Sequence, residues 1–423
     1  MREYIERISD KVLAEHLESK GAVLIEGPKW CGKTTSGKHL AKSFIEMDRP
    51  DMTEQYQQMA RLKPTALLEG EVPRLIDEWQ IAPGIWNAVR YEVDQRGEFG
   101  QFILTGSSVP PVLDESMHTG TGRIVRMKMR PMSLYESKDS TGTVSLEDMF
   151  LGKDIYASDN RSIDDIAYFI CRGGWPLALN VSKKIALKQA FDYYDSIVND
   201  DISRVDGVKR DSERTKRLMK SYARNVATQA SLETIREDCI VNDTDTFDKE
   251  TLYSYINALK KTFVIEDSPA WNPNLRSKTA IRTADTRYFV DPSIATAALG
   301  LGPEDLINDL NMMGLIFENL CIRDLRIYSD ALDGDVYHYR DKTGLECDAV
   351  VHLRNGRYGL VEVKLGGDKL INEGAETLLK LVNKIDLDKM KEPAFTMVLC
   401  GVAPFAYRRE DGVYVVPISC LKN

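Results

Sequence analysis

Apolar and polar residues alternate along the first part of the chain in blocks that are typical of strands separated by helices. Runs of Val, Ile and Leu predict buried strands, and apolar residues at helical spacing predict the helices between them. The predicted strands cover residues 22–26, 45–48, 73–77, 101–106 and 123–129, and the predicted helices cover 33–44 and 84–96. Because helical crossovers join parallel strands, this order predicts an α/β fold with a parallel sheet covered on both faces.

The pattern becomes mainly helical after residue 151. Short helices are predicted at 213–227, 231–238 and 248–261, and strand-like segments follow at 263–265 and 287–290. Three helices with a two-stranded wing describe a winged helix. We therefore expect a helical middle region that ends in a winged-helix domain.

Positive charge is concentrated in these helices. Residues 204–224 carry eight basic and three acidic side chains, and the predicted wing adds Arg276, Lys278 and Arg282. This charge favours contact with DNA. A small lid on an ATPase, with its cations solvated or facing nucleotide, fits the same residues, and the sequence leaves both interpretations open.

The last part of the chain combines a helix with a hairpin. Apolar residues between 310 and 320 fall at helical spacing, and strands are predicted at 336–340, 346–351 and 358–364. The Asn355-Gly356 pair between the last two strands is typical of a hairpin turn, because it favours the primed turns that match strand twist. We expect an α/β domain here.

Length and composition limit the class of protein. The chain has 423 residues, is 43% hydrophobic and has a formal net charge of −9. We predict three domains, at residues 1–150, 151–300 and 301–423. The net charge argues against broad coating of nucleic acid, although a local basic face is compatible with it.

The same sequence favours a cytoplasmic protein. No apolar run approaches the roughly 18 residues of a membrane helix, so we expect no membrane partner. The start, Met1 to Tyr4, has no apolar signal region. Seven scattered cysteines without a C-x-x-C pair favour reduced thiols over a disulfide framework or a zinc site.

A phosphate-binding motif follows the first predicted strand. Residues 27–34 read Gly-Pro-Lys-Trp-Cys-Gly-Lys-Thr, which is the full G-x-x-x-x-G-K-[ST] spacing before a predicted helix. Backbone N–H groups at the helix start would point at the β-phosphate, Lys33 would reach the β- and γ-phosphates, and Thr34 would ligate Mg²⁺. The predicted nucleotide-binding residues are Gly27, Pro28, Lys29, Trp30, Cys31, Gly32, Lys33, Thr34 and Thr35.

Two further strands end in residues that complete such a site. Asp77 follows a buried-strand pattern and would hold Mg²⁺, while the adjacent Glu78 would act as general base on the attacking water. The strand 101–106 continues into small hydroxyl residues, so Thr105 or Ser107 would face that water. Arg123 leaves a Pro- and Gly-rich loop and would supply charge to a γ-phosphate, in cis or across a subunit boundary. A solvated arginine or a structural salt bridge explains Arg123 equally well.

Acidic residues in the last domain have a spacing that favours a second chemistry. Asp348 precedes Glu362 by fourteen residues, and the Glu362-Val363-Lys364 strand puts two charged side chains on one face. In a hairpin, Asp348 and Glu362 would together ligate Mg²⁺ or Mn²⁺. Lys364 would activate water or stabilise a pentacovalent phosphate, and Glu318 would complete the ligand set. This is the core of the PD-(D/E)XK nuclease type, although a charged strand edge gives the same pattern.

With these segments assembled, the chain resembles a prokaryotic family of AAA-type P-loop ATPases that carry a C-terminal domain of unknown function. The likeness rests on the motifs at residues 27–34, 75–78, 103–108, 122–123 with 129–133, 173–176, 288–292 and 317–320, and on Asp348 with residues 362–364. The resemblance spans nearly the whole chain and implies an ATPase domain, a winged-helix lid and a nuclease-like terminal domain. Trp30 departs from it, because members often have small residues or Arg at that place.

These observations predict an ATP-binding protein that acts as a slow Mg²⁺-dependent ATPase and nucleotide switch. ATP is preferred over GTP because no N-K-x-D series follows the P-loop at a suitable place. Two alternatives stay open: a nucleotide-gated, metal-dependent DNA nuclease, and a non-enzymatic module that binds DNA or protein. The predicted partners are ATP, DNA through the winged helix and terminal domain, and further copies of the chain.

Overall fold

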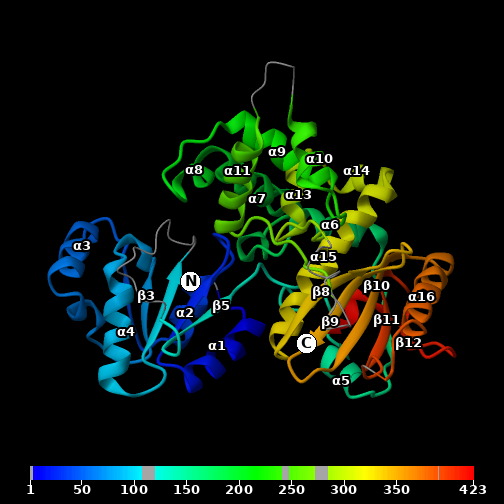
Figure 1. Cartoon of the computed structure of the whole chain (residues 1–423), viewed down its shortest axis with the longest axis horizontal. Coiled ribbons are helices and arrows are strands. Elements are labelled where there is room, and N and C mark those ends of the chain that lie inside the picture. Colours follow the sequence, from blue (N-terminus) through cyan, green and yellow to red (C-terminus); the bar gives the residue numbers. More distant parts are fainter. Residues whose placement is uncertain (1–2, 107–119, 241–246, 272–283, 389) are drawn as a thin grey trace. The chain divides into compact units, whose positions relative to one another are not determined.

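The computed structural model describes residues 3–106, 120–240, 247–271, 284–388 and 390–423 (Figure 1). Contacts divide the chain into two compact units. The first contains Met1–Pro131, Asp200–Lys209 and Asn257–Phe263, and the second contains Met132–Asn199, Arg210–Ile256 and Val264–Asn423. Each unit has its own large sheet. The predicted division into three domains, at residues 1–150, 151–300 and 301–423, stays a prediction.

The sheet of the first unit has five parallel strands in the order β2-β3-β4-β1-β5. Its strands are β1 (Ala22–Glu26), β2 (Ser43–Glu46), β3 (Arg74–Asp77), β4 (Phe102–Gly106) and β5 (Ile124–Lys128), and its helices include α1 (Ile8–Ser19), α2 (Lys33–Leu40), α3 (Thr53–Leu62), α4 (Gly84–Arg96) and α8 (Ile202–Arg204). The parallel α/β fold predicted from the alternation is confirmed. The central strands β1 and β4 are buried along most of their length, as a sheet covered on both faces requires.

Apolar side chains leave both faces of this sheet. Along β1, Val23 and Ile25 belong to one buried cluster, whereas Ala22 and Leu24 belong to another. This alternation follows from the two-residue period of a strand. The second cluster is completed by side chains of α4 such as Trp86, which is 1% exposed.

Two element boundaries differ from the sequence prediction. Helix α2 ends at Leu40 rather than at residue 44, and the next strand begins at Ser43 rather than at residue 45. Ala41 has an extended backbone, and its N–H still bonds to the carbonyl of Gly37. The N–H of Lys42 donates to the carbonyl of Pro73 at 2.8 Å. The chain therefore joins the sheet as soon as the helix stops.

The second unit combines a group of helices with a mixed sheet. Its helices are α5 (Leu146–Phe150), α6 (Ile163–Arg172), α7 (Lys183–Ser196), α9 (Ser212–Arg224), α10 (Leu232–Cys239), the first part of α11 (Lys249–Lys261), α13 (Pro292–Leu299), α14 (Pro303–Asn308), α15 (Leu310–Asp330) and α16 (Asp368–Val382). Helix α13 packs on α6, α7, α9 and α15, which makes it central to the helical part. It is apolar on nearly every face, as a buried helix must be.

The sheet of the second unit has seven strands in the order β7-β12-β13-β11-β10-β9-β8. The strands are β7 (Ala157–Ser158), β8 (Gly334–Arg340), β9 (Glu346–Leu353), β10 (Tyr358–Gly366), β11 (Phe395–Val402), β12 (Phe405–Arg408) and β13 (Tyr414–Pro417), and β6 (Val144–Ser145) pairs separately with β14 (Leu421–Lys422). Strand β10 runs parallel to β11 and antiparallel to β9. The hairpin predicted from Asn355-Gly356 is confirmed, and Gly356 has a φ of 82° there.

The predicted wing forms only in part within the described residues. Ile265 pairs with Phe289 and Ser268 pairs with Thr286, both as isolated antiparallel bridges rather than as a regular ladder. Arg276, Lys278 and Arg282 lie outside the described residues. A further bridge joins Ala270 to His338 on β8. The winged-helix assignment stays a prediction, but these bridges bring residues 265–271 beside the sheet of the second unit.

The seven cysteines are all buried, and none of them is in a disulfide. None of the helices in the described ranges is both long enough and apolar enough to span a bilayer.

Candidate functional site

The predicted phosphate loop joins β1 to α2 in the first unit. Gly27 passes so close to the next strand that an added Cβ would lie 2.0 Å from the carbonyl oxygen of Met129. Gly32 has a φ of 106° and immediately precedes α2. Both positions therefore require glycine, which gives the motif spacing a structural reason. Trp30 has a left-handed backbone with a φ of 64° and a side chain that is 40% exposed, and Thr35 is exposed on the first turn of α2.

The two lysines of this loop make different contacts. Lys33 is buried, and its ammonium donates to the carbonyl oxygens of Gly27 and Pro28 at 2.9 and 2.7 Å. The ammonium of Lys29 lies 2.5 Å from the carboxylate of Asp201, which follows α7 in sequence and belongs to the same unit. The loop thus carries two positive charges. Lys33 bonds to the backbone of the loop itself, and Lys29 pairs with an acid that is distant in sequence.

Arg7 binds the backbone of the phosphate loop, and the sequence analysis did not predict this role. Its guanidinium donates to the carbonyl of Cys31 at 2.7 Å and to the carbonyl of Arg130 at 2.9 Å, and the residue is 7% exposed. Cys31 is also buried, with its thiol 3.5 Å from the carbonyl of Met129. No local motif could have identified Arg7, because its partners are distant in sequence.

Asp77 ends β3 and meets two hydroxyl groups. The hydroxyl of Thr34, on the first turn of α2, donates to Asp77 Oδ1 at 2.8 Å. The hydroxyl of Thr105, on β4, donates to the same oxygen. The sequence placed these three residues in one site, and the structure brings them together. Thr105 is fully buried and bonded to the acid itself.

Glu78 lies next to this group in a strained backbone. It has a φ of 52°, and its carboxylate accepts a hydrogen bond from the side-chain amide of Gln80. Burial raises the pKa of Glu78, and the positive charge of Lys33 partly opposes that effect. A carboxylate with a raised pKa takes up a proton more readily than an exposed one, which suits a general base. Gln80, which orients it, was not predicted.

The remaining predicted residues of this domain do not join the group. Ser107 lies outside the described residues. Arg123 precedes β5, and its carbonyl accepts a hydrogen bond from Ala22 at the start of β1. The phosphate loop follows the opposite end of β1, so Arg123 lies at the wrong edge of the sheet for the triphosphate of its own chain. Its guanidinium instead pairs with Asp94 at 2.8 Å, which agrees with the salt-bridge interpretation.

The side chains of Thr34 and Asp77 are suitable ligands for the Mg²⁺ ion that accompanies a bound nucleotide. A hydroxyl and a carboxylate oxygen lie side by side, and both are hard oxygen ligands of the kind Mg²⁺ prefers. Mg²⁺ takes only one or two protein carboxylates and completes its shell with water and phosphate oxygens. The chemistry of this pair therefore fits the ion.

Four charged residues of the terminal domain form a second group, in the second unit. Glu362 and Lys364 lie on β10, where the Lys364 ammonium is 2.7 Å from Glu362 and 3.8 Å from Asp348 on β9. The backbone N–H of Val363 donates to Asp348 at 2.7 Å. The side chains of Glu362, Asp348 and Lys364 are only 5%, 19% and 25% exposed. The spacing of fourteen residues thus does bring the two acids to one lysine.

Glu318 approaches the same group from α15. Burial raises its pKa well above the ordinary value, and the charge of Asp348 adds to the effect. Burial likewise raises the pKa of Asp348 and of Glu362. Burial alone would lower the pKa of Lys364, but the carboxylates of Asp348 and Glu362 outweigh it and raise that pKa. The lysine is therefore held as a cation, which suits charge stabilisation better than proton abstraction.

The second group has too few protein ligands to hold a divalent cation unless a phosphate supplies further oxygens. Across the described ranges, no set of three or more His, Cys, Asp and Glu side chains is arranged to hold a metal ion, so the prediction that Glu318 completes the ligand set of Asp348 and Glu362 is wrong. Asp348 and Glu362 still offer two carboxylates, which is the number Mg²⁺ uses when a substrate phosphate supplies further oxygens. The donor set therefore fits a cation that binds together with a phosphate.

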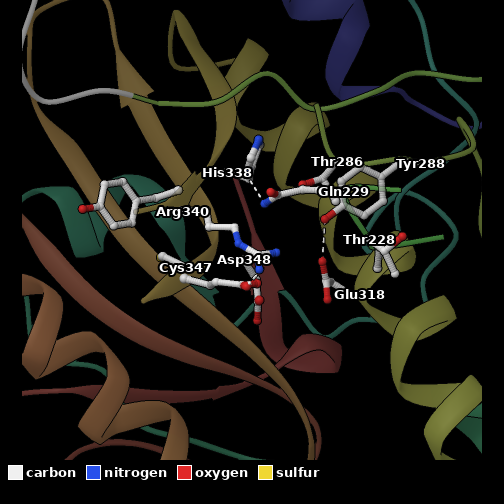
Figure 2. Close-up of a pocket in the computed structure, with 12 residues that line it drawn as sticks. Thr228, Gln229, Thr286, Tyr288, Glu318, His338, Arg340, Cys347 and Asp348 are labelled. Atoms are coloured by element: carbon white, nitrogen blue, oxygen red, sulfur yellow. Dashed lines mark hydrogen bonds and ion pairs between the residues drawn. The ribbon is translucent and has the colours of Figure 1, made fainter. Parts of the chain in front are cut away.

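A cavity opens beside Glu318 and Asp348 (Figure 2). Its volume is about 200 Å³. The Tyr288 hydroxyl donates to Glu318 at 2.5 Å, and the side-chain amide of Gln229 lies 3.2 Å from Nδ1 of His338. Residues from the middle of the chain therefore line a cavity that reaches the acids of the last domain. Tyr288 belongs to the motif at residues 288–292 that the sequence analysis identified, whereas no sequence pattern identified Gln229.

Comparisons with known families assign the first domain only. Residues 19–138 match an AAA domain. Residues 163–305 match a domain of unknown function, DUF8612, and residues 313–421 match another, DUF4143. Among curated proteins, nothing matches this chain.

Solved structures match this chain at low sequence identity and with low TM-scores. One is a Walker-type ATPase of Pyrococcus abyssi, 16% identical, with 70% of this chain and 96% of that chain covered and a TM-score of 0.42. Another is PCH-2 of C. elegans, 13% identical, with 56% and 61% covered and a TM-score of 0.23. A third is a DNA replication initiation factor, 13% identical, with 62% and 96% covered and a TM-score of 0.21. Together with the P-loop geometry, the AAA-domain match supports an AAA-type P-loop ATPase over residues 19–138.

Proposed function

We propose that this protein is a Mg²⁺-dependent ATP hydrolase that uses the bound nucleotide as a switch. The observation that carries the proposal is the contact of Thr34 and Thr105 with one oxygen of Asp77, beside the phosphate loop. In this proposal, the hydroxyl of Thr34, the carboxylate of Asp77 and the ammonium of Lys33 together receive a triphosphate and its cation.

Each residue has a distinct role in this proposal. Lys33 exchanges its loop carbonyls for phosphate oxygens. Thr34 and Asp77 hold the cation, which would neutralise charge on the transferring phosphoryl group. Thr105 fixes the rotamer of Asp77. Glu78, oriented by Gln80, accepts the proton of the attacking water.

The switch is supported by the ion pair of Lys29 with Asp201. An anionic phosphate in the loop competes with Asp201 for the same ammonium, because both are negatively charged. Nucleotide binding then loosens the segment that carries Asp201. Hydrolysis and phosphate release restore the pair. The presence or absence of nucleotide in the loop thereby changes the contacts of residues that are far away in sequence.

The test compares ATP binding and phosphate release for the wild type, Lys33→Ala and Asp77→Ala. We expect Lys33→Ala to lose binding and Asp77→Ala to lose turnover. Lys38→Ala is the matched control, because Lys38 lies on the same helix but pairs with Glu46 at its surface. Equal retention of ATP by the wild type and both site variants would refute the proposal.

A second candidate function is favoured by the convergence of Glu318, Asp348, Glu362 and Lys364. We propose hydrolysis of a phosphodiester at this group, with Asp348 and Glu362 holding a divalent cation and Lys364 donating to the phosphate. The cation would stabilise charge on the phosphoryl oxygens. The test is to incubate DNA and Mn²⁺, with and without ATP, with the wild-type protein and in parallel with the Asp348→Ala variant. Lack of cleavage in every condition would leave the group without this activity.

Binding of DNA through the predicted winged helix stays a weaker proposal. In α9, Lys216 pairs with Glu213 at 2.8 Å, and Arg224 lies 3.7 Å from Asp238. Part of the positive charge is therefore balanced within the helices. Salt-dependent DNA retention that is lost on charge reversal of Lys216, Arg217 and Lys220 would support the DNA role over the lid role.

A further inference from the structure

The lining of the cavity beside the acids of the second unit combines charged and uncharged groups. Its acids include Glu318 from α15 and Asp348 from β9 (Figure 2). Its uncharged groups include Thr228 and Gln229, from the connection between α9 and α10, together with Thr286. A nucleotide whose phosphodiester lies at the acids would therefore have uncharged hydrogen-bonding groups within the same cavity.

The uncharged groups of the lining are held in place by the protein. The Thr228 hydroxyl donates to the carbonyl of Asn225 at 2.8 Å. Gln229 is fixed by its contact with His338, and burial lowers the pKa of that histidine to about 4, so the contact is between neutral groups at neutral pH. Thr286 is 5% exposed, and its backbone bonds to Ser268 in both directions. Fixed polar groups of this kind suit a base or sugar edge, whereas backbone phosphates call for cations.

The size and depth of the cavity limit what can enter. At about 200 Å³ it is smaller than the roughly 300–1,000 Å³ of ordinary ligand pockets. The acids are also recessed, since Glu362 exposes 5% of its side chain and Asp348 exposes 19%. A base-paired nucleotide would have to bring its partner strand into the same small space. An unpaired nucleotide at a strand end enters at the lowest cost, because nothing has to be unpaired.

An ion pair of the cavity lining can exchange for phosphate. Arg340 and Glu346 both line the cavity, and they lie 3.0 Å apart with side chains that are 46% and 48% exposed. A pair this exposed contributes little stability, so its arginine is free to bind an incoming phosphate instead.

We infer that this cavity receives the terminal nucleotide of a single strand, with the phosphodiester at Asp348 and Glu362 and the base or sugar against Gln229 and Thr286. The inference rests on the second candidate function, hydrolysis at the acid group. Water attacks phosphorus, the bond from phosphorus to the leaving sugar oxygen breaks, and that oxygen takes up a proton. The products are a nucleoside monophosphate and a shortened strand.

Binding is tested on the full chain carrying Lys33→Ala, so that the phosphate loop does not contribute. The probe is thymidine 5′-monophosphate with Ca²⁺, titrated by calorimetry. We expect one site per chain, weakened about tenfold by Thr286→Val and by Asp348→Asn. The matched control is Thr377→Val on α16, a half-buried threonine whose hydroxyl donates to the carbonyl of Glu373 in the same helix; this variant should bind as tightly as the parent. Lack of binding, or equal binding by all four proteins, would overturn the inference.

Cleavage is tested with Mn²⁺ on a linear single strand, a circular single strand and a covalently closed duplex. We expect mononucleotides from the linear strand and an intact closed duplex. Nicking of the closed duplex as fast as the linear strand would overturn the inference while leaving hydrolysis standing. Binding of the monophosphate without cleavage of any substrate would support the assigned occupant and refute hydrolysis.

Discussion

The hydroxyl of Thr34 donates a 2.8 Å hydrogen bond to Oδ1 of Asp77. This contact joins the first turn of α2 to the end of β3 and puts the two proposed Mg²⁺ ligands within one hydrogen bond of each other. The carboxylate is 5% exposed, and Thr105 bonds to the same oxygen from the neighbouring strand. These two proposed ligands are thus side by side before nucleotide arrives, which would limit the reorganisation that cation binding requires.

Replacing Asp77 with Asn should remove hydrolysis and spare the fold. The amide oxygen can still accept from Thr34 and Thr105, but the negative charge for the cation is lost. We expect phosphate release to fall by about 100-fold or more and the melting temperature to stay near that of the wild type. Asp51→Asn, on an exposed acid, is the control. A variant with full turnover would contradict the assigned role.

Replacing Arg7 with Ala should weaken both the first unit and its hold on nucleotide. The substitution leaves the buried carbonyls of Cys31 and Arg130 without their guanidinium donor, which costs about 1–3 kcal/mol. The loop then samples conformations that do not fit phosphate, so ATP affinity should fall as well. Thermal unfolding and ATP titration measure the two effects. Arg61→Ala, on an exposed site of α3, should change neither.

The parts of this protein that sequence predicts well are those where local chemistry decides. The P-loop strand, its glycines and the Asp77-Glu78 strand end follow from short-range pattern, because phosphate binding requires those residues at that spacing. The hairpin that brings Asp348 to Glu362 was equally predictable, since Asn355-Gly356 fixes the turn and the turn fixes the register.

The parts that sequence does not predict depend on packing between distant segments. Arg123 looked suited to a γ-phosphate, but the register of β5 on β1 puts it at the other edge of the sheet. Gln229 meets His338 although they are 109 residues apart. The bridges of residues 265–271 and the backbone hydrogen bonds of Arg287 with residues 227 and 228 bring the two segments together. No pattern within either segment specifies it.

Stability should depend on pH through His338. Burial lowers its pKa to about 4, against about 6.5 in an unfolded chain. Between these values the unfolded chain binds more protons, so stability is present above pH of about 6.5 and is lost as pH falls toward 4. The full effect is about 3 kcal/mol. Chemical denaturation of His338→Gln should show a smaller loss over this range.

The matched control for that comparison is His39→Gln, because His39 is exposed on α2. It should keep the pH dependence of the wild type. The charge of Arg340 also disfavours protonation of His338. Arg340→Gln should therefore raise the pKa of His338 in the folded protein slightly, and the loss of stability at low pH should be slightly smaller. If His338→Gln and the wild type lost stability in parallel from pH 6.5 to 4, the histidine would not be the responsible group.

Replacing Arg323 with Met should destabilise the second unit strongly. The guanidinium lies 2.8 Å from Asp291 and 2.7 Å from Asp324, and all three side chains are at most 1% exposed. Met fills similar volume but leaves two buried carboxylates without their cation, which costs about 3–5 kcal/mol. The loss should be smaller at pH 5 than at pH 8, because protonation removes the uncompensated charge. Arg354→Met, whose arginine is 76% exposed, should cost less than about 1 kcal/mol. Equal losses for the two variants, measured by chemical denaturation, would show that the buried pair contributes no more than a surface one.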